Sequence, residues 1–319
     1  MARRRKVKKK VWKFLIIIII LCIGIYKGIG LYKDYKYKQT YEYKLTEIGY
    51  SLDDTKVIQK VFKEDKELEY ILSLNKVDYL VDLIKEKYFI KDRLDEYLEY
   101  INEHKSTELN KAVTIINTYT NKDYYSLDYK TDTSKNEAML VNKYFGLDNT
   151  YTPDDLMTIS TLYAWGSGCE IRKILWEDYL EMFNAAKEAG HYLMINSGYR
   201  TYESQETIFK NYADTQGTEF AESIAARPGH SEHQTGLSID IFSTKNTNRK
   251  TFADSEAAKW LADNSYKYGF ILRYPKDKEK VTGYQYESWH FRYVGKKIAK
   301  YVYDNNITFD EYYAYFLDN

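Results

Sequence analysis

The chain has 319 residues with 47 basic and 47 acidic side chains, so its formal net charge is zero. The charges are unevenly placed, because residues 1–33 hold ten basic side chains and no acidic one. The rest of the chain therefore carries 37 basic against 47 acidic side chains, a net charge of −10. A surface of this sign argues against nucleic acid as a partner.

A basic segment followed by an apolar run opens the chain. The run from Phe14 to Tyr26 is about 13 residues long, shorter than the roughly 20 needed to span a bilayer. Flanking lysines can extend their amines to the membrane surface, which lengthens the expected span to residues 11–32. The excess of positive charge before it predicts a cytoplasmic tail at 1–10, a single-pass anchor in the cell membrane, and an extracytoplasmic remainder. A cleaved signal peptide is the alternative, although no small-x-small cleavage site follows.

Cysteine usage excludes an internal disulfide outside the membrane. Cys22 falls in the expected span, and Cys169 is the only other cysteine. The exterior part must therefore be stabilised by a packed core, and its length predicts two units.

The region 33–120 has the apolar spacing of short helices, as in Leu80, Val81 and Ile84. Ser51, followed by acidic residues, is a plausible helix cap. We expect a helical spacer or binding module here. A polar, turn-prone linker is expected at 121–139, and a second unit at 140–319.

The second unit is expected to open with an amphipathic helix at 171–189, which Gly190 ends. A short strand at 192–196 follows. Arg200 comes directly after that strand, close to Gly198, where a bend in the backbone lets a side chain point into a cleft.

Further elements follow the same pattern. We expect a helix from about Glu203, a strand at 237–241, a helix at 255–268 and a strand at 270–274.

Residues 228–240, with the sequence PGHSEHQTGLSID, concentrate metal-binding side chains around a glycine turn. His233 and Asp240 can meet when the chain doubles back, but one imidazole and one carboxylate make an incomplete zinc site. The third ligand must lie elsewhere. We expect His230 to be structural, because a fourth protein ligand would close the position that a catalytic zinc keeps for water.

The run 286–293 alternates like a strand and supplies the missing groups. His290 can be the third ligand, and Glu287, three residues earlier, can reach a metal-bound water without being a ligand. A zinc peptidase needs this division, since the metal activates water while a carboxylate moves its proton.

These motifs resemble those of the VanY-type zinc D,D-carboxypeptidases, within the LAS metallopeptidases of hedgehog-like fold. The resemblance covers roughly Leu140 to Phe316 and rests on three runs, which are SGYR with Gln205, Ser-x-His-x6-Asp from Ser231, and GYQYESWHFRYVG. Ser288 departs from the pattern, because a proline often precedes the Trp-His pair. The implied fold class is α+β, with a small antiparallel sheet flanked by helices, here preceded by the helical module and the membrane helix.

The resemblance implies a role for each matching residue. The implied zinc ligands are His233, Asp240 and His290, with Glu287 as the general base and Arg200 as the cation that faces the substrate. Gln205 and Ser231 match positions that line the substrate cleft, and we expect Trp289 to form a wall of it.

The expected function is that of a zinc-dependent D-alanyl-D-alanine carboxypeptidase, which removes the terminal D-alanine from peptidoglycan stem peptides. Two alternatives stay open, an L,D-carboxypeptidase that trims tetrapeptide stems and a non-catalytic wall-binding protein of the same fold. The module at 33–120 lies outside the resemblance, so it is a spacer or binds the wall or a partner.

Overall fold

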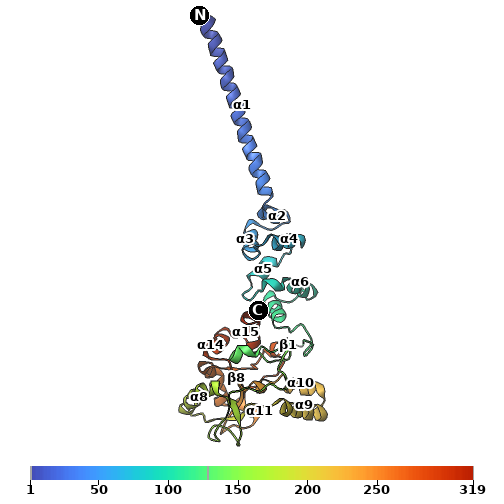
Figure 1. The fold of residues 1–319 in the computed structure, drawn as a ribbon, viewed down its shortest axis with the longest axis vertical. Helices are drawn as coiled ribbons and strands as arrows, with labels where there is room; N and C mark the ends of the chain where they lie inside the picture. The colour runs from blue at the N-terminus through green and yellow to red at the C-terminus, as the bar shows by residue number, and fades with distance from the viewer. Residues whose placement is uncertain (1, 128, 319) are drawn as a thin grey trace. The chain divides into compact units, whose positions relative to one another are not determined.

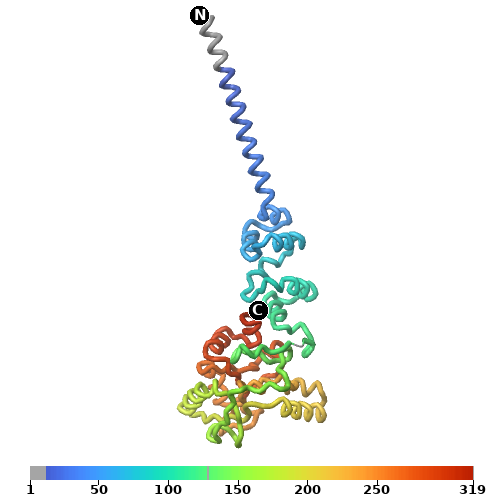
Figure 2. Tube along the Cα trace, in the orientation of Figure 1, coloured from blue at the N-terminus to red at the C-terminus, as the bar shows by residue number. Residues whose placement is uncertain are grey.

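The structure is a computed structural model that describes residues 2–127 and 129–318, and the surroundings of side chains from Trp12 onward. It divides into two compact units, residues 1–95 and residues 96–319. Figures 1 and 2 follow the chain from α1 to the C-terminal helices α14 and α15. The predicted cytoplasmic tail at 1–10 lies outside the residues whose side chains are described.

The first unit is made of helices. Its elements are α1 (Ala2–Lys38), α2 (Tyr41–Glu47), α3 (Leu52–Val61), α4 (Asp65–Ser73), α5 (Leu80–Lys85) and the 3₁₀ helix η1 (Lys91–Arg93). In α1, the stretch Trp12–Lys38 is long and apolar enough to cross a membrane, and its large apolar side chains are exposed. A membrane anchor and a signal sequence share these properties.

The helical character predicted for the segment after α1 is confirmed. Ser51 caps α3 as predicted, because its side chain accepts the Asp54 N–H while the Asp54 carboxylate accepts the Ser51 N–H. Leu45, Ile58 and Ile71 are fully buried among these short helices. Tertiary packing of apolar faces therefore stabilises helices that are too short to persist alone.

The two units divide inside α6 (Leu94–Glu103), so most of this helix and all of α7 (Leu109–Asn117) belong to the second unit. Residues 121–139 contain β1 (Tyr129–Lys130), which pairs in parallel with β2 (Phe145–Gly146). The functional division at 33–120, 121–139 and 140–319 stays a prediction.

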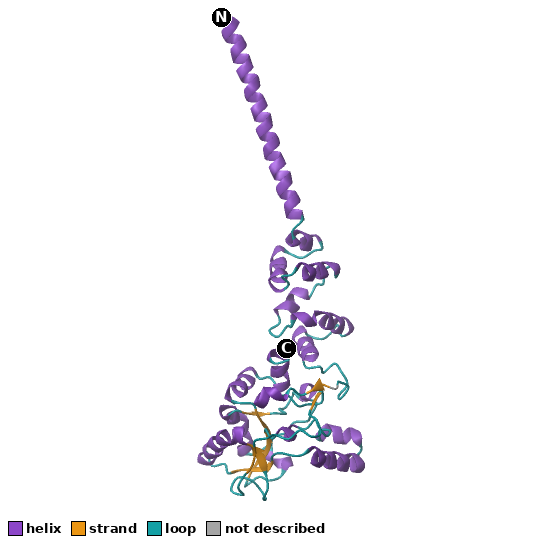
Figure 3. Cartoon of the chain, viewed as in Figure 1, coloured by secondary structure: helices purple, strands orange, loops and turns teal. Residues whose placement is uncertain are grey.

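The second unit combines helices with short strands (Figure 3). Its further helices, α and 3₁₀, are η2 (Thr133–Ala138), η3 (Lys173–Leu175), α8 (Trp176–Glu188), α9 (Tyr202–Gln216), α10 (Thr218–Ile224), η4 (Glu232–Thr235), α11 (Arg249–Phe252), α12 (Glu256–Asn264), η5 (Ser265–Tyr268), α13 (Glu279–Thr282), α14 (Lys296–Asn305) and α15 (Phe309–Phe316). Its further strands are β3 (Leu156–Thr158), β4 (Glu170–Arg172), β5 (Leu193–Ser197), β6 (Ser238–Ser243), β7 (Phe270–Leu272) and β8 (His290–Tyr293).

A four-stranded antiparallel sheet with the order β5-β6-β8-β7 is the centre of this unit. All residues of β6 are buried. The register pairs Asp240 with His290 across β6 and β8, and Asp240 with Ser197 across β6 and β5. Because paired residues on neighbouring strands point to the same face, the three side chains form a row across the sheet.

Apolar faces of α8 and α12 pack against this sheet. Tyr179, Met182 and Ala186 of α8 are fully buried in one core with Ile239 and Leu261, as the amphipathic pattern predicts. Burial of a side chain such as that of Met182 contributes about 1.5–3 kcal/mol. The predicted α+β class, a small antiparallel sheet flanked by helices, is confirmed.

Two predicted boundaries are wrong. The helix predicted to begin at residue 171 begins at Trp176, because Ile171 pairs with Met157 in the antiparallel β3–β4 ladder. The strand predicted over 286–293 is restricted to β8, and the residues before it form a turn in which the His290 N–H donates to the Glu287 carbonyl oxygen (3.3 Å).

Candidate metal centre and catalytic cavity

The three side chains predicted as zinc ligands lie together and are buried. Asp240 and His290 come from neighbouring strands, and Asp240 Oδ1 is 3.1 Å from His290 Nδ1. His233 comes from η4, and its Nε2 is 3.5 Å from the same oxygen. The two imidazole rings are nearly perpendicular, with centroids 5.0 Å apart. Two nitrogens and one carboxylate oxygen therefore face a common point.

A glycine turn brings His233 to this point. η4 ends at Gly236, whose φ of +64° is left-handed, and β6 begins two residues later. Nδ1 of His233 lies 2.7 Å from the Gly198 carbonyl oxygen. This bond assigns the ring proton to Nδ1, so Nε2 keeps its lone pair for a metal.

The donor set fits zinc. The ligand atoms of His233, Asp240 and His290 all lie within 4.8 Å of one another. Ligands bound about 2.0 Å from a tetrahedral ion lie about 3.3 Å apart, close to the separations of 3.1 and 3.5 Å around Asp240 Oδ1. Two histidines and one carboxylate are a donor set of catalytic zinc sites, which leave a fourth position for water.

Gly198 is expected to be intolerant of substitution, because its carbonyl oxygen orients His233 and a Cβ there would clash with the Glu170 carbonyl oxygen. Gly198→Ala should lower the free energy of unfolding by about 1–3 kcal/mol, measured by urea denaturation, and should weaken zinc binding.

Gly190→Ala is the control, since Gly190 has a left-handed φ of +88° but open space around it. It should cost about 1–2 kcal/mol from the backbone alone and leave zinc affinity intact. Equal zinc affinities for both variants would contradict the role of Gly198.

A cavity of about 380 Å³ adjoins the three ligands. Every other residue predicted for the site lines it, and these residues are Arg200, Gln205, Ser231, Glu287 and Trp289. The structure thus brings together the whole predicted set from segments that are far apart in the sequence.

Arg200 is held in place by its neighbours in the cavity. Its two terminal nitrogens donate to Gln205 Oε1 (2.7 Å) and to Ser197 Oγ (3.0 Å). Gln205 is buried and donates to the Ala226 carbonyl oxygen (2.7 Å), so it cannot swing away. Because Arg200 lines the cavity and a guanidinium carries five N–H donors, it can also meet an anionic ligand there.

Glu287 lies beside the three candidate ligands but is not part of their cluster. Its Oε2 is 3.9 Å from His290 Nδ1. Burial raises the pKa of Glu287 to about 7. A divalent cation nearby would favour the charged form, which is the form that can accept a proton.

Trp289 and Ser231 form walls of the cavity. The indole of Trp289 stacks on Phe242, with ring centroids 6.2 Å apart. His230, in contrast, lies outside the metal cluster. Its Nδ1 is 2.8 Å from the Asn142 carbonyl oxygen, which agrees with the structural role expected for it.

Comparison with known proteins shows the family of the chain. The model of the VanY family, described as D-alanyl-D-alanine carboxypeptidase, matches residues 168–296. The chain is 44% identical over 184 residues to YodJ of Bacillus subtilis (strain 168), which covers 56% of this chain and 67% of YodJ. The chain belongs to the VanY family. The matched residues include the three candidate ligands, Glu287 and Arg200.

Other relatives of this VanY-family chain agree. The bifunctional D-Ala-D-Ala dipeptidase and D-Ala-D-Ala carboxypeptidase VanXYC of Enterococcus gallinarum is 35% identical, over 44% of this chain and 74% of that protein. The solved structure of the LdcB LD-carboxypeptidase has a TM-score of 0.56 and 42% identity, over 61% of this chain and 92% of that chain. Both the sequence and the fold of the second unit are therefore those of a carboxypeptidase.

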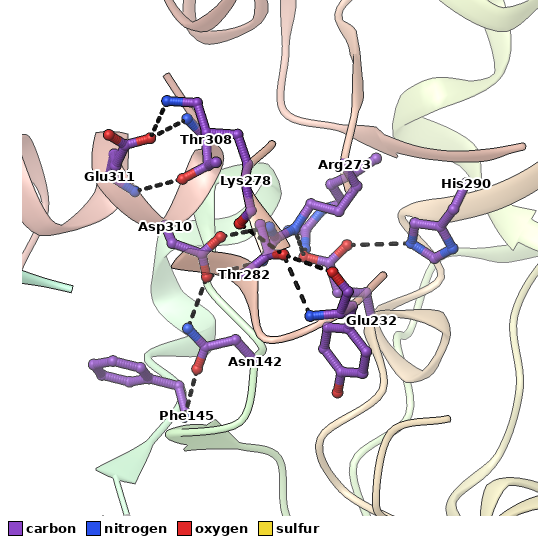
Figure 4. A network of polar contacts seen from close by, with 12 residues as sticks. Asn142, Phe145, Glu232, Arg273, Lys278, Thr282, His290, Thr308, Asp310 and Glu311 are labelled. Carbon is purple, nitrogen blue, oxygen red and sulfur yellow. Dashed lines mark hydrogen bonds and ion pairs between the residues drawn. The ribbon is translucent and has the colours of Figure 1, made fainter. Parts of the chain in front are cut away.

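The sequence analysis missed a buried charge network behind the VanY-family site (Figure 4). Glu232 lies between Arg273, Arg292 and the candidate ligand His290, and Arg273 also pairs with Asp310 of α15. One sequence signal was present, because Arg292 stands two residues after His290 in a strand and so shares its face. The contributions of Glu232 and Asp310 depend on tertiary contacts that no local pattern reveals.

Arg249 was also missed. It lines the cavity from α11, with its guanidinium 5.2 Å from the Trp289 ring and 3.6 Å from Asp240 Oδ2. It follows a polar loop without any periodic signal.

Proposed function

We propose that the chain is a zinc-dependent carboxypeptidase that removes the terminal D-alanine from peptidoglycan stem peptides ending in D-Ala-D-Ala. The observation that supports the proposal is one cavity lined by His233, Asp240 and His290, which could hold a metal, together with the carboxylate of Glu287 and the hydrogen-bonded Arg200. The D-alanyl-D-alanine carboxypeptidase activity for which the VanY family and the relative from Enterococcus gallinarum are named supports this substrate.

In the proposed hydrolysis, each residue of the site has a separate role. Zinc held by His233, Asp240 and His290 supplies Lewis-acid chemistry, which polarises a carbonyl group and acidifies water. Glu287 accepts the proton of the attacking water and delivers it to the departing amine as the peptide C–N bond breaks. One proton is taken and one is returned, so Glu287 ends in its starting state.

Arg200 would bind the terminal carboxylate of the peptide or the oxyanion that develops during attack. Gln205 and Ser197 hold the guanidinium in one orientation, which limits the entropy lost when substrate binds. Ser231 and Trp289 would contact the peptide as cavity walls.

Peptides with free and amidated C-termini test the carboxylate role of Arg200. Charge-assisted hydrogen bonds to an arginine contribute enough binding energy that amidation should lower kcat/KM about 10- to 100-fold for the wild-type protein. Arg200→Ala should lose this preference, because the cation that distinguishes the two ends is gone. Arg249→Ala removes the other cavity arginine and should keep the preference. Equal cleavage of both peptides by the wild-type protein would indicate an endopeptidase.

The second candidate activity is L,D-carboxypeptidase, which the 42% identity to the LdcB LD-carboxypeptidase favours. Mass spectrometry of pentapeptide and tetrapeptide stems after incubation with the exterior part distinguishes the two. A pentapeptide shortened to a tetrapeptide supports D,D-activity, and a tetrapeptide shortened to a tripeptide supports L,D-activity. Cleavage of neither peptide, despite bound zinc, would support the non-catalytic wall-binding alternative.

We further propose that α1 anchors the protein as a single-pass helix in the cell membrane, with the catalytic unit outside. The exposed apolar stretch Trp12–Lys38 supports an anchor, and the basic residues before it support the orientation. In this arrangement the segment after α1 serves as a spacer or as a wall- or partner-binding module.

Protease added to intact cells should remove the domain beyond about residue 33 and leave a membrane-bound N-terminal fragment. Immunoblots with antibodies against the catalytic unit provide the measurement, and lysed cells give the control for protease access. Protection in intact cells would contradict the orientation, and a shortened soluble form alone would indicate a cleaved signal peptide.

A further inference from the structure

Glu232 lies directly behind the metal ligand His290 and is fully buried. Its Oε1 accepts hydrogen bonds from Arg273 Nε (2.8 Å) and Arg292 Nη1 (2.9 Å). Its Oε2 accepts one from Ser238 Oγ (3.1 Å) and lies 3.5 Å from His290 Nε2. The two oxygens thus have separate partners, the two arginines for Oε1 and the imidazole for Oε2. Figure 4 shows Glu232 with Arg273 and His290.

This separation decides which nitrogen of His290 carries a proton. An ionised carboxylate only accepts hydrogen bonds, so the ring nitrogen that faces Glu232 must be the donor, Nε2–H. The lone pair then stays on Nδ1, the nitrogen 3.1 Å from Asp240 Oδ1 and thus on the side of the metal cluster. His233 is fixed in the same way by the Gly198 carbonyl oxygen, with its two nitrogens in opposite roles.

We propose that Glu232 is a positioning residue, which holds His290 in the tautomer that binds zinc through Nδ1, and that glutamine cannot replace it. The inference rests on the proposed zinc-dependent function but concerns a step before catalysis, the binding of the metal.

Glutamine would fail for a geometric reason. Arg273 and Arg292 have only donors, so they require the single amide oxygen of a glutamine on their side. The amide NH₂ would then face His290 Nε2 and donate to its lone pair. The ring proton would move to Nδ1, where it blocks the metal.

Asp310 offers a matched control in the same network. It is buried, accepts hydrogen bonds from Arg273 Nη2 (3.2 Å) and Asn142 Nδ2 (2.8 Å), and is not a partner of His290. Asp310→Asn removes one negative charge from beside Arg273, as Glu232→Gln does, but leaves the carboxylate behind His290 in place. A purely structural role for Glu232 would therefore affect both variants alike.

Zinc affinity is measured by competition with a chromogenic chelator, using wild-type protein, Glu232→Gln and Asp310→Asn. Loss of a hydrogen-bonding partner behind a metal ligand typically lowers metal affinity 10- to 100-fold, and we expect a loss of that size for Glu232→Gln. Asp310→Asn should bind zinc like the wild type, although its urea midpoint should fall. Equal zinc affinity for all three proteins, or equal loss in both variants, overturns the proposal.

A second measurement needs no variant. Long-range ¹⁵N–¹H correlation spectra of the zinc-loaded wild-type protein should show the His290 ring proton on Nε2 and metal on Nδ1. Metal on Nε2 would overturn the proposal even if Glu232→Gln failed to fold. Wild-type turnover of pentapeptide stems, measured in parallel, tests the proposed function separately.

Discussion

Glu287→Gln should retain zinc and lose about 10²- to 10⁴-fold in turnover, because glutamine matches the size of the side chain but cannot accept the proton of the attacking water. Glu287 lines the cavity and its carboxylate is 3.9 Å from His290 Nδ1, yet it is not one of the three clustered ligands. A change at this residue should therefore lower turnover without lowering the zinc content. The measurement is kcat for a pentapeptide stem together with zinc content by atomic absorption.

The control is Glu279→Gln, the same change at an exposed glutamate of α13. It should alter neither turnover nor zinc content. Loss of zinc from Glu287→Gln would make Glu287 a ligand, and full turnover with zinc bound would assign the proton transfer to another group.

His290→Ala should abolish stoichiometric zinc binding, and turnover should fall at least as far as in Glu287→Gln. The two remaining ligands rarely hold zinc against buffer, and the water loses the metal that acidifies it. The measurement is zinc per chain after dialysis, followed by turnover before and after zinc addition.

His191→Ala provides the control, because this histidine packs near Trp260, with ring centroids 6.3 Å apart, outside the metal cluster. It should keep one zinc per chain. Retention of one tightly bound zinc by His290→Ala would refute the ligand assignment.

The sequence predicted which residues meet at the site, the candidate ligands, the candidate base and the cavity arginine, because each stands in a short local motif. It did not predict how Glu287 reaches the metal centre. On a continuous strand, residues three apart point to opposite faces, so the predicted strand over 286–293 would have separated Glu287 from His290. The turn before β8 removes this conflict, since the His290 N–H folds back onto the Glu287 carbonyl oxygen.

Other features lay beyond local patterns for physical reasons. Ile171 suits an amphipathic helix and a buried strand equally well, and only its pairing with Met157 decides for the strand. Glu232 and Asp310 look like surface acids in the sequence. Their burial depends on Arg273, which directly follows β7 and forms an ion pair with each of them. The positive charge of Arg273 offsets the cost of burying the two carboxylates.

The pairing of Asp240 with His290, 50 positions apart in the chain, has a consequence for the order of events during maturation. Pairing of strands that are far apart in the sequence is slow, because the entropy of loop closure is lost before the contacts between the strands form. Until β6 meets β8, the three candidate ligands do not lie together. Zinc binding through all three candidate ligands therefore requires this pairing. Because zinc would bind the folded chain and not the unfolded one, the stability of the fold should rise with the free zinc concentration.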